Sequence, residues 1–453
     1  MNDRRQFSFQ FRNLILILSF LFTGILSGCD FQLDIRELVD QIIEQIVPPP
    51  TTSQTPTSPT LTIEATEEVV ETPVAPPLSG AVELVLWVPP QFDPQSDSPA
   101  SKIFKQQIAD FEALHDDVFI SVRVKALSGP TGLLEALTIT SGAATQAMPS
   151  LIALQRSDLE TAVSRKLLIP FDAYSSSIDG QDWYDYAQKL TVVGGNSYGL
   201  PFAGDALTMV YRPLVVGESP GNWNDLIRRG ETIAFPAADP QSLIALNLYL
   251  SLGGELESAQ RLPQLDLELL TQLYQLFADG AQSGVLPLWL TELQRDSDTW
   301  TSYNDLRSNW VITWASRYLS DPTEDSALAL FPSLNNSSVT LSDGWIWCLT
   351  DPRVQAHELS VDLAEFLTDA DYLAQWAPVN GVLPVRPTTL TEWDDQSIQT
   401  LLGQIASSAH NRPNNEIINT IGLVMEDQLV QILSGRTTAP FAAQSVIDRI
   451  ENP

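Results

Sequence analysis

The chain has few cysteines, histidines and basic residues. Its 453 residues include two cysteines, three histidines and 24 lysines or arginines, against 56 aspartates or glutamates, which gives a formal charge of −32. The histidines lie far apart and no H-E-x-x-H motif or clustered Cys/His set occurs, so neither a transition-metal site nor a cofactor is expected. Nucleic-acid phosphates and anionic lipid headgroups repel a chain of this charge. Nucleic acid is therefore excluded as a partner.

The N-terminus lacks an apolar run long enough to span a membrane. Three arginines precede an apolar run of 13 residues at 14–26, whereas a spanning helix needs about 20. This arrangement is typical of a secretory signal peptide, although an uncleaved anchor is the alternative. The closing residues Leu26-Ser27-Gly28-Cys29 resemble the lipobox of bacterial lipoproteins. The resemblance implies cleavage after residue 28, lipid modification of Cys29 and a place on the outer face of the cytoplasmic membrane.

A lipid on Cys29 leaves Cys348 without a disulfide partner, so stability must come from the core. Residues 29–80 are predicted to form a short helix followed by a tether. Positions 31–46 carry apolar residues at helical spacing, and 48–80 contain eight prolines, eight threonines and no Lys, Arg or aromatic residue. Such a composition cannot bury enough surface to offset chain entropy, which predicts a disordered linker.

From position 81 onward the periodicity alternates between strand and helix. Apolar or alternating strands are predicted at 82–88, 118–124 and 151–154, and amphipathic helices at 101–114, 133–138 and 158–166. This order predicts an α/β fold with a parallel sheet covered by helices on both faces. The 373 residues from 81 to 453 are many for one core and suit two lobes. Asp239-Pro240 and Asp351-Pro352 are each expected to start a helix.

Several short motifs follow one another in a recognisable order. They lie at 84–87, 111–115, 167–171, 198–205, 209–211, 220–226, 363–367, 375–376, 380–386 and 432–436. Together they resemble the extracellular solute-binding proteins of bacterial ATP-driven importers, in particular the sugar-binding group that includes the maltose-binding protein. Two departures are Met148-Pro149-Ser150, where Pro-Asp is common, and Gly422, near which the maltose binder has an aromatic ligand contact. The ligand subtype therefore does not transfer.

The resemblance implies a hinged, class II periplasmic-binding-protein fold that closes on its ligand. Lobe 1 is expected to comprise 81–204 and 346–378, and lobe 2 to comprise 205–345 and 379–453. The expected ligand is a carbohydrate, and the expected protein partners are permease subunits with a cytoplasmic ATPase. The chain is expected to be a monomer without catalytic residues, attached to the membrane only through its N-terminal lipid.

Candidate ligand contacts combine aromatic rings with polar groups, because a sugar offers apolar faces for stacking and hydroxyls for hydrogen bonds. Asp205 follows a predicted crossing between lobes, and the resemblance places an acidic contact there. Trp345 follows a glycine within a strand and is the preferred stacking platform. The remaining candidates follow apolar strands or match the family segment around 310–317: Trp87, Gln155, Asp158, Trp314, Ser316 and Arg317. Core packing is the alternative for both Trp87 and Trp345, a solvated turn for Asp205, and an ion pair for Arg317.

Three other functions are alternatives to solute capture. The segment 195–199 matches the G-x-S-x-G hydrolase motif, but Pro201 forbids the helix that must follow, so a hairpin around 192–196 is expected. A glycosidase with two carboxylates brought together by the fold remains an alternative. So does a ligand-sensing receptor for a signalling partner, because fold alone does not separate these roles.

Overall fold

The computed structural model describes residues 81–452, except 259, 261 and 335–338. The chain divides into two units, Met1–Val74 and Ala75–Pro453, and every described residue belongs to the second. The signal peptide, Cys29, the helix at 31–46 and the tether at 48–80 lie outside the described residues. No helix in the part that the structure describes has the length and hydrophobicity needed to cross a membrane.

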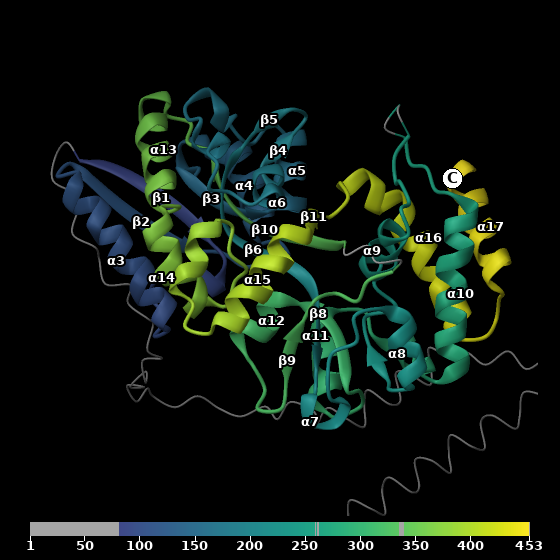
Figure 1. Ribbon diagram of the computed structural model, residues 1–453. Coiled ribbons are helices and arrows are strands. Elements are labelled where there is room, and N and C mark those ends of the chain that lie inside the picture. The colour runs from purple at the N-terminus through teal and green to yellow at the C-terminus, as the bar shows by residue number, and fades with distance from the viewer. Residues whose placement is uncertain (1–80, 259, 261, 335–338, 453) are drawn as a thin grey trace, which may run out of the picture. The chain divides into compact units, whose positions relative to one another are not determined.

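The described unit is built around one large mixed sheet (Figure 1). Its strand order is β2 (Val118–Val124), β1 (Val82–Val88), β3 (Leu151–Gln155), β10 (Thr340–Leu349), β6 (Gly199–Tyr211), β8 (Trp310–Trp314) and β7 (Ile233–Ala234). The strands β2, β1 and β3 are mutually parallel, while β10 runs antiparallel to both β3 and β6. Two short strands join the path, β9 (Ala327–Ala329) on β6 and β11 (Ala409–Asn411) on β10.

Helices cover both faces of the first part of the sheet. Alternate residues of β1 point to opposite faces, so Leu84, Leu86 and Val88 join one buried cluster and Trp87 joins another. Helix α3 (Pro99–Leu114) packs with the first cluster, and α4 (Leu133–Ala143) and α5 (Arg156–Ser164) pack with the second. The predicted parallel arrangement with helices on both faces is confirmed for β2, β1 and β3, whereas the β10–β3, β10–β6 and β6–β8 pairs are antiparallel and make the sheet as a whole mixed. Cys348 is buried as a free thiol in the second cluster.

The second part of the sheet has its own helical cover. The helices in this part are α7 (Pro213–Val216), α8 (Trp223–Arg229), α9 (Leu243–Ser251), α10 (Leu267–Ser283), α11 (Asp296–Asn304), α12 (Ala315–Ser320), α16 (Asn415–Leu433) and α17 (Ala439–Glu451). The remaining α-helices are α6 (Asp185–Leu190), α13 (His357–Phe366), α14 (Ala370–Asn380) and α15 (Gln396–Ser408). Helices α10, α16 and α17 pack together and bury Tyr274, whose hydroxyl donates to the Met425 carbonyl at 3.2 Å.

The long strands β6 and β10 run through both parts. Residues 199–206 of β6 pair with residues 342–348 of β10, while residues 207–211 of β6 pair with β8. Asp205 lies opposite Asp343 in this ladder, and Trp345 opposite Ala203. The expected lobe boundaries after 204 and 345 fall at this crossing and stay a prediction.

The segment that follows the expected lobe boundary at 378 makes contacts that favour assigning it to lobe 1. The Pro384 carbonyl accepts a hydrogen bond from the Tyr186 hydroxyl at 2.8 Å, and the Val385 carbonyl accepts one from the Tyr184 amide at 3.0 Å. Arg386 pairs with Asp182 at 3.6 Å. These contacts attach the segment to α6 and its surroundings, so it packs with the part expected to be lobe 1 rather than lobe 2.

The two Asp-Pro pairs predicted the first residue of each helix less exactly than the periodicity predicted the presence of the helices. Asp239 accepts hydrogen bonds from the amides of Gln241 and Leu243, as a cap should, but α9 begins only at Leu243 because Ser242 is left-handed with φ +50°. Helix α13 likewise begins at His357 rather than Pro352, because a 3-10 turn comes first. The hairpin expected around 192–196 is confirmed as β4 (Val192–Val193) and β5 (Asn196–Ser197).

The crossing also depends on a close backbone approach at Gly204. This residue exchanges two backbone hydrogen bonds of 2.9 Å with Leu383, and a Cβ there would lie 1.9 Å from the Tyr186 hydroxyl oxygen. We expect Gly204→Ala to lower the free energy of unfolding by about 1–3 kcal/mol through overpacking. Gly142→Ala is the matched control, since it sits in α4 with open space around it and gains helix propensity. Calorimetric melting temperatures that fall equally for both variants would contradict this reading of Gly204.

Candidate functional site

A cavity of 970 Å³ lies where the sheet passes between its two parts. Residues from the loops after β1 and β3 line it together with residues from α9, α11, α12 and β11–α16. Six of the eight predicted site residues line this cavity: Gln155, Asp205, Trp314, Ser316, Arg317 and Trp345. The tertiary structure therefore brings together side chains that are up to 190 positions apart in sequence.

Asp205 is the carboxylate at the centre of the crossing. It accepts hydrogen bonds from the backbone amides of Ala206 at 2.9 Å and Ser316 at 3.0 Å, and from the Ser316 hydroxyl. Burial raises the pKa of Asp205 to about 7, although these hydrogen bonds act in the opposite direction. The carboxylate thus joins β6 to the first turn of α12, which carries Arg317.

A second carboxylate faces the same cavity from the neighbouring strand. Asp343 is paired with Asp205 in the β6–β10 register and accepts from the Gly344 amide at 2.8 Å. Burial raises its pKa, while the nearby charge of Arg412 lowers it. Two partly desolvated carboxyl groups therefore offer acceptors on one side of the cavity.

Arg412 was missed by the sequence reasoning. Its side chain is only 6% exposed and lines the cavity, and it donates to the Asn415 side-chain oxygen at 3.0 Å and the Gln241 side-chain oxygen at 3.3 Å. No carboxylate of the described residues lies within ion-pair distance of its guanidinium. Since a guanidinium has five N–H donors, Arg412 retains donors for a ligand. In the sequence this arginine stands only in an isolated Arg-Pro pair, which does not indicate that it lines a cavity.

Aromatic rings supply the apolar part of the cavity. Trp345 is partly buried and packs edge-on against Phe92, with ring centroids 5.4 Å apart and planes at 86°. Trp314 is also partly buried and lines the cavity, as does the more deeply buried Trp300. Trp347, two residues along β10 from Trp345, is instead buried and stacked on Phe202 at 4.5 Å. Trp345 is therefore the candidate stacking platform because it is partly exposed, whereas Trp347 is a core residue.

Arg317 takes part in an ion pair at the cavity wall. Its Nε donates to Asp296 at 2.9 Å, and its side chain remains 41% exposed. Asp296 also accepts from the Thr313 hydroxyl. The pairing that the sequence left as an alternative is present, and it holds the guanidinium at the cavity.

Two predicted residues do not line the cavity. Trp87 is 2% exposed within a core cluster, with the Lys125 ammonium 4.6 Å from its ring centroid. Asp158 lies in the first turn of α5, and its pKa is raised to about 6 by burial and by the charges of Asp343 and Glu135. Neither placement supports direct ligand contact.

The place of the aromatic contact expected near Gly422 is occupied by the chain itself. A Cβ at Gly422 would lie 2.5 Å from the Pro240 carbonyl oxygen, and the Ser242 hydroxyl donates to the Gly422 carbonyl at 2.9 Å. Only a glycine fits this contact between α16 and the loop before α9. The described residues also contain no group of three or more His, Cys, Asp or Glu side chains arranged to hold a metal ion.

The bacterial extracellular solute-binding protein family has a sequence model that matches residues 106–400. The chain belongs to this family. Membership implies a place outside the cytoplasm and a role in binding a solute, which agrees with the export predicted from the N-terminus. No curated protein sequence matches the chain.

Solved structures with the two-lobed fold of the maltose-binding protein resemble this family member along most of its length. The GacH receptor of Streptomyces glaucescens, described with acarbose, has a TM-score of 0.64 and 16% identity over 82% of this chain and 99% of its own. The cyclic α-maltosyl-1,6-maltose binding protein of Arthrobacter globiformis has a TM-score of 0.68 and 16% identity over 82% and 98%. The sugar-binding protein MalE of Xanthomonas citri has a TM-score of 0.65 and 15% identity over 82% and 96%. The predicted two-lobed fold is confirmed.

The raised pKa of Asp205 makes stability depend on pH. Because the folded state holds its proton up to about pH 7 whereas an unfolded Asp releases it near 3.9, the free energy of unfolding falls as pH rises through this interval. We expect Asp205→Asn to flatten this fall by about 1–2 kcal/mol, a value discounted for partial exposure. Melting temperatures between pH 4 and 8 measure it, and parallel curves for variant and parent would contradict it.

Proposed function

We propose that this solute-binding protein captures a carbohydrate in the cavity between its lobes and delivers it to an ATP-driven importer. The observation that carries the proposal is the composition of the cavity. Partly exposed tryptophans, Trp345 and Trp314, lie beside the acceptors of Asp205 and Asp343 and the free donors of Arg412. A pyranose presents apolar faces to rings and hydroxyls to such groups. The carbohydrates named for the three similar structures support the same class.

Capture requires that one ligand touch both lobes. Gln155 and Trp345 extend from the part built on β1–β3, whereas Trp314 and Arg317 belong to the part built on β8 and α12. A ligand that contacts both sets binds the closed arrangement more tightly than the open one, and this difference in affinity shifts the population toward closure. The β6–β10 crossing, which belongs to both parts, is the place about which they would move.

Asp205 has two roles in this proposal. Its carboxylate fixes the Ser316 end of α12 and so positions Arg317, and its partial exposure leaves it accessible to a ligand hydroxyl. Above its raised pKa of about 7, Asp205 is ionised and a sugar hydroxyl donates a strong hydrogen bond to it, and below that pH the carbonyl oxygen of the protonated group still accepts. Gln155 adds an amide that both donates and accepts.

The N-terminal segment completes the proposed function. A diacylated Cys29 would hold the chain at the outer face of the cytoplasmic membrane, and the segment 48–80 would give the lobes room to meet the permease subunits. The protein acts as a monomer and makes or breaks no covalent bond of the ligand.

Trp345→Ala tests the stacking platform. We expect it to weaken carbohydrate binding by about 1–3 kcal/mol, because the apolar face of the sugar loses its ring contact. Isothermal titration with maltose, maltotriose and monosaccharides measures the change. The matched control is Trp289→Ala, since Trp289 is also partly buried but lies outside the cavity.

Equal loss of affinity in both tryptophan variants would remove Trp345 from the site. If no carbohydrate binds the parent protein in these titrations, the proposed ligand class is wrong. Appearance of shortened sugars in the same mixtures would instead favour the glycosidase alternative.

Cys29→Ser tests the anchor independently of the ligand. We expect the parent to incorporate a palmitate analogue and to sediment with membranes, and the variant to lose both properties because only a thiol accepts the first lipid. Cys348→Ser is the control, since Cys348 is buried and its thiol is inaccessible. Retention of label in Cys29→Ser would refute the lipoprotein assignment.

A further inference from the structure

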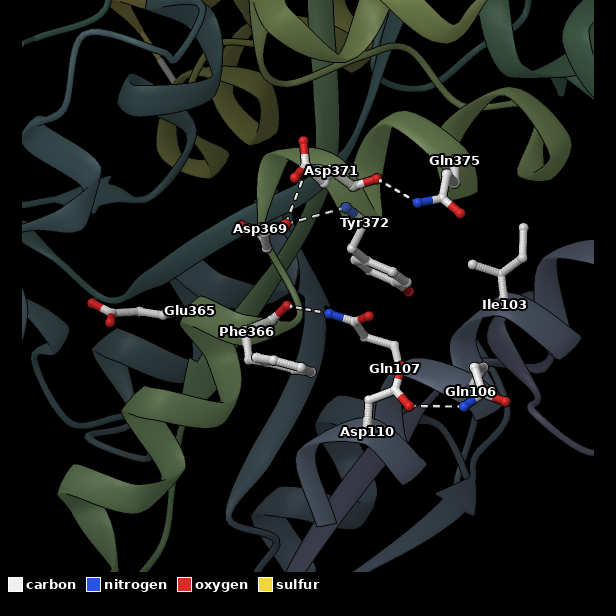
Figure 2. A pocket seen from close by; sticks show the side chains of 10 residues that line it. All are labelled: Ile103, Gln106, Gln107, Asp110, Glu365, Phe366, Asp369, Asp371, Tyr372 and Gln375. Carbon is white, nitrogen blue, oxygen red and sulfur yellow. Dashed lines mark hydrogen bonds between the residues drawn. The ribbon is translucent and has the colours of Figure 1, made fainter. Parts of the chain in front are cut away.

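A second cavity, of 440 Å³, lies between α3 and the corner where α13 meets α14 (Figure 2). It is separate from the ligand cavity, although the same two helices reach both. Ala100 and Asn380, at the start of α3 and the end of α14, line the ligand cavity, whereas Ile103–Asp110 and Asp369–Gln375 contribute to the second one. We call this second cavity the α3–α14 groove.

The rim of the α3–α14 groove is acidic. Asp110, Glu365, Asp369 and Asp371 line it, and no Lys or Arg is among its lining residues. Asp369 caps α14 by accepting from the amides of Asp371 and Tyr372, and Glu365 accepts from the Ser175 hydroxyl. The exposed carboxylates of Asp110 and Asp371 form no ion pair with a described residue. Their negative charge is therefore available to a cation.

The floor of the groove is apolar and contains one hydroxyl, that of the largely buried Tyr372. Ile103 and Phe366 are partly buried, and Phe366 contacts Phe111 edge-on with centroids 5.4 Å apart. Tyr372 is 7% exposed, and its ring extends from α14 toward α3 in Figure 2. No described residue forms a hydrogen bond with its hydroxyl, whose pKa is raised well above 10 by burial. A neutral phenol oxygen thus points into the groove as a free acceptor.

We propose that the α3–α14 groove binds a lysine or arginine side chain presented by an apolar segment of a partner protein. The cationic head would lie in the groove between the sides that carry Asp110 and Asp371, where their negative charge attracts it and where it can donate to the Tyr372 oxygen. The methylene stem and a neighbouring apolar residue would cover Phe366 and Ile103, as long basic side chains do on apolar surface. A volume of 440 Å³ is near the lower end of ligand pockets and suits a few side chains rather than a large ligand.

Two other occupants fit the groove less well. An anionic membrane surface would be repelled by the acidic rim. A free polyamine would satisfy the carboxylates, but its methylene chain alone would cover less of Phe366 and Ile103 than a basic side chain together with a neighbouring apolar residue. The inference does not depend on which solute the ligand cavity binds, because the two cavities share no lining residue.

Fluorescence anisotropy tests this proposal on the full chain in non-ionic detergent. The probe is a labelled, acetylated hexapeptide of alternating Leu and Arg, and the same peptide with Glu in place of Arg serves as its counterpart. We expect saturable binding of the Arg peptide alone. The double variant Asp110→Asn/Asp371→Asn should weaken it about five- to tenfold, and Tyr372→Phe about two- to threefold.

A charge-matched control separates the groove from general attraction to an acidic protein. The double variant Asp279→Asn/Asp448→Asn removes the same charge from exposed positions on α10 and α17 and should change affinity by less than about twofold. Equal weakening by both double variants, equal binding of the Glu peptide, or absence of saturable binding would overturn the proposal. Tighter binding of spermidine than of the Arg peptide would also overturn it, in favour of a small-molecule site.

Discussion

The backbone pairing of β6 with β10 is the constraint on which the rest of the structure depends. Both strands run through the two parts of the sheet, so their ladder fixes which residues meet at the cavity. It places Asp205 opposite Asp343 and leaves Trp345 at a register shift next to the crossing. Glycines allow this close approach, because a Cβ at Gly344 would lie 2.6 Å from the Ala203 carbonyl oxygen. The chemistry of the cavity is thus a consequence of strand register.

Charge in the cavity follows from the same geometry. Burial of two facing carboxyl groups is unfavourable, and hydrogen bonds from Ser316 and Gly344 together with the charge of Arg412 offset part of that cost. A polyhydroxylated ligand can add donors to the carboxylates and acceptors to Arg412 at the same time. Binding would therefore supply hydrogen-bond partners to groups that the fold has already removed from water. A ligand that reaches these groups from both lobes only in the closed state binds that state more tightly.

Helices α3 and α14 connect the ligand cavity with the α3–α14 groove. Their ends at Ala100 and Asn380 reach the ligand cavity, and their opposite ends form the acidic groove. The net charge of −32 gives the whole molecule a negative field, but the groove adds an apolar floor and an unpartnered hydroxyl to that field. Those local features distinguish it from the acidic surface in general.

The sequence by itself determined the α/β class and the family, because periodicity and ordered motifs are local properties of the chain, and the export signal remains a prediction. It also identified six of the residues that line the cavity: Gln155 from its place at the end of an apolar strand, Trp345 from the glycine before it, and Asp205, Trp314, Ser316 and Arg317 from the family resemblance. It predicted Trp87 as a ligand contact with core packing as the alternative, and the structure buries Trp87 in a core cluster, because the same strand-end pattern occurs in core and cavity alike. It overlooked Arg412, which an isolated Arg-Pro pair does not indicate. Only tertiary structure decided which face of β1 is buried, where 384–388 packs and how far α9 extends. Burial, register and charge pairing depend on contacts between residues distant in sequence, and no local pattern specifies them.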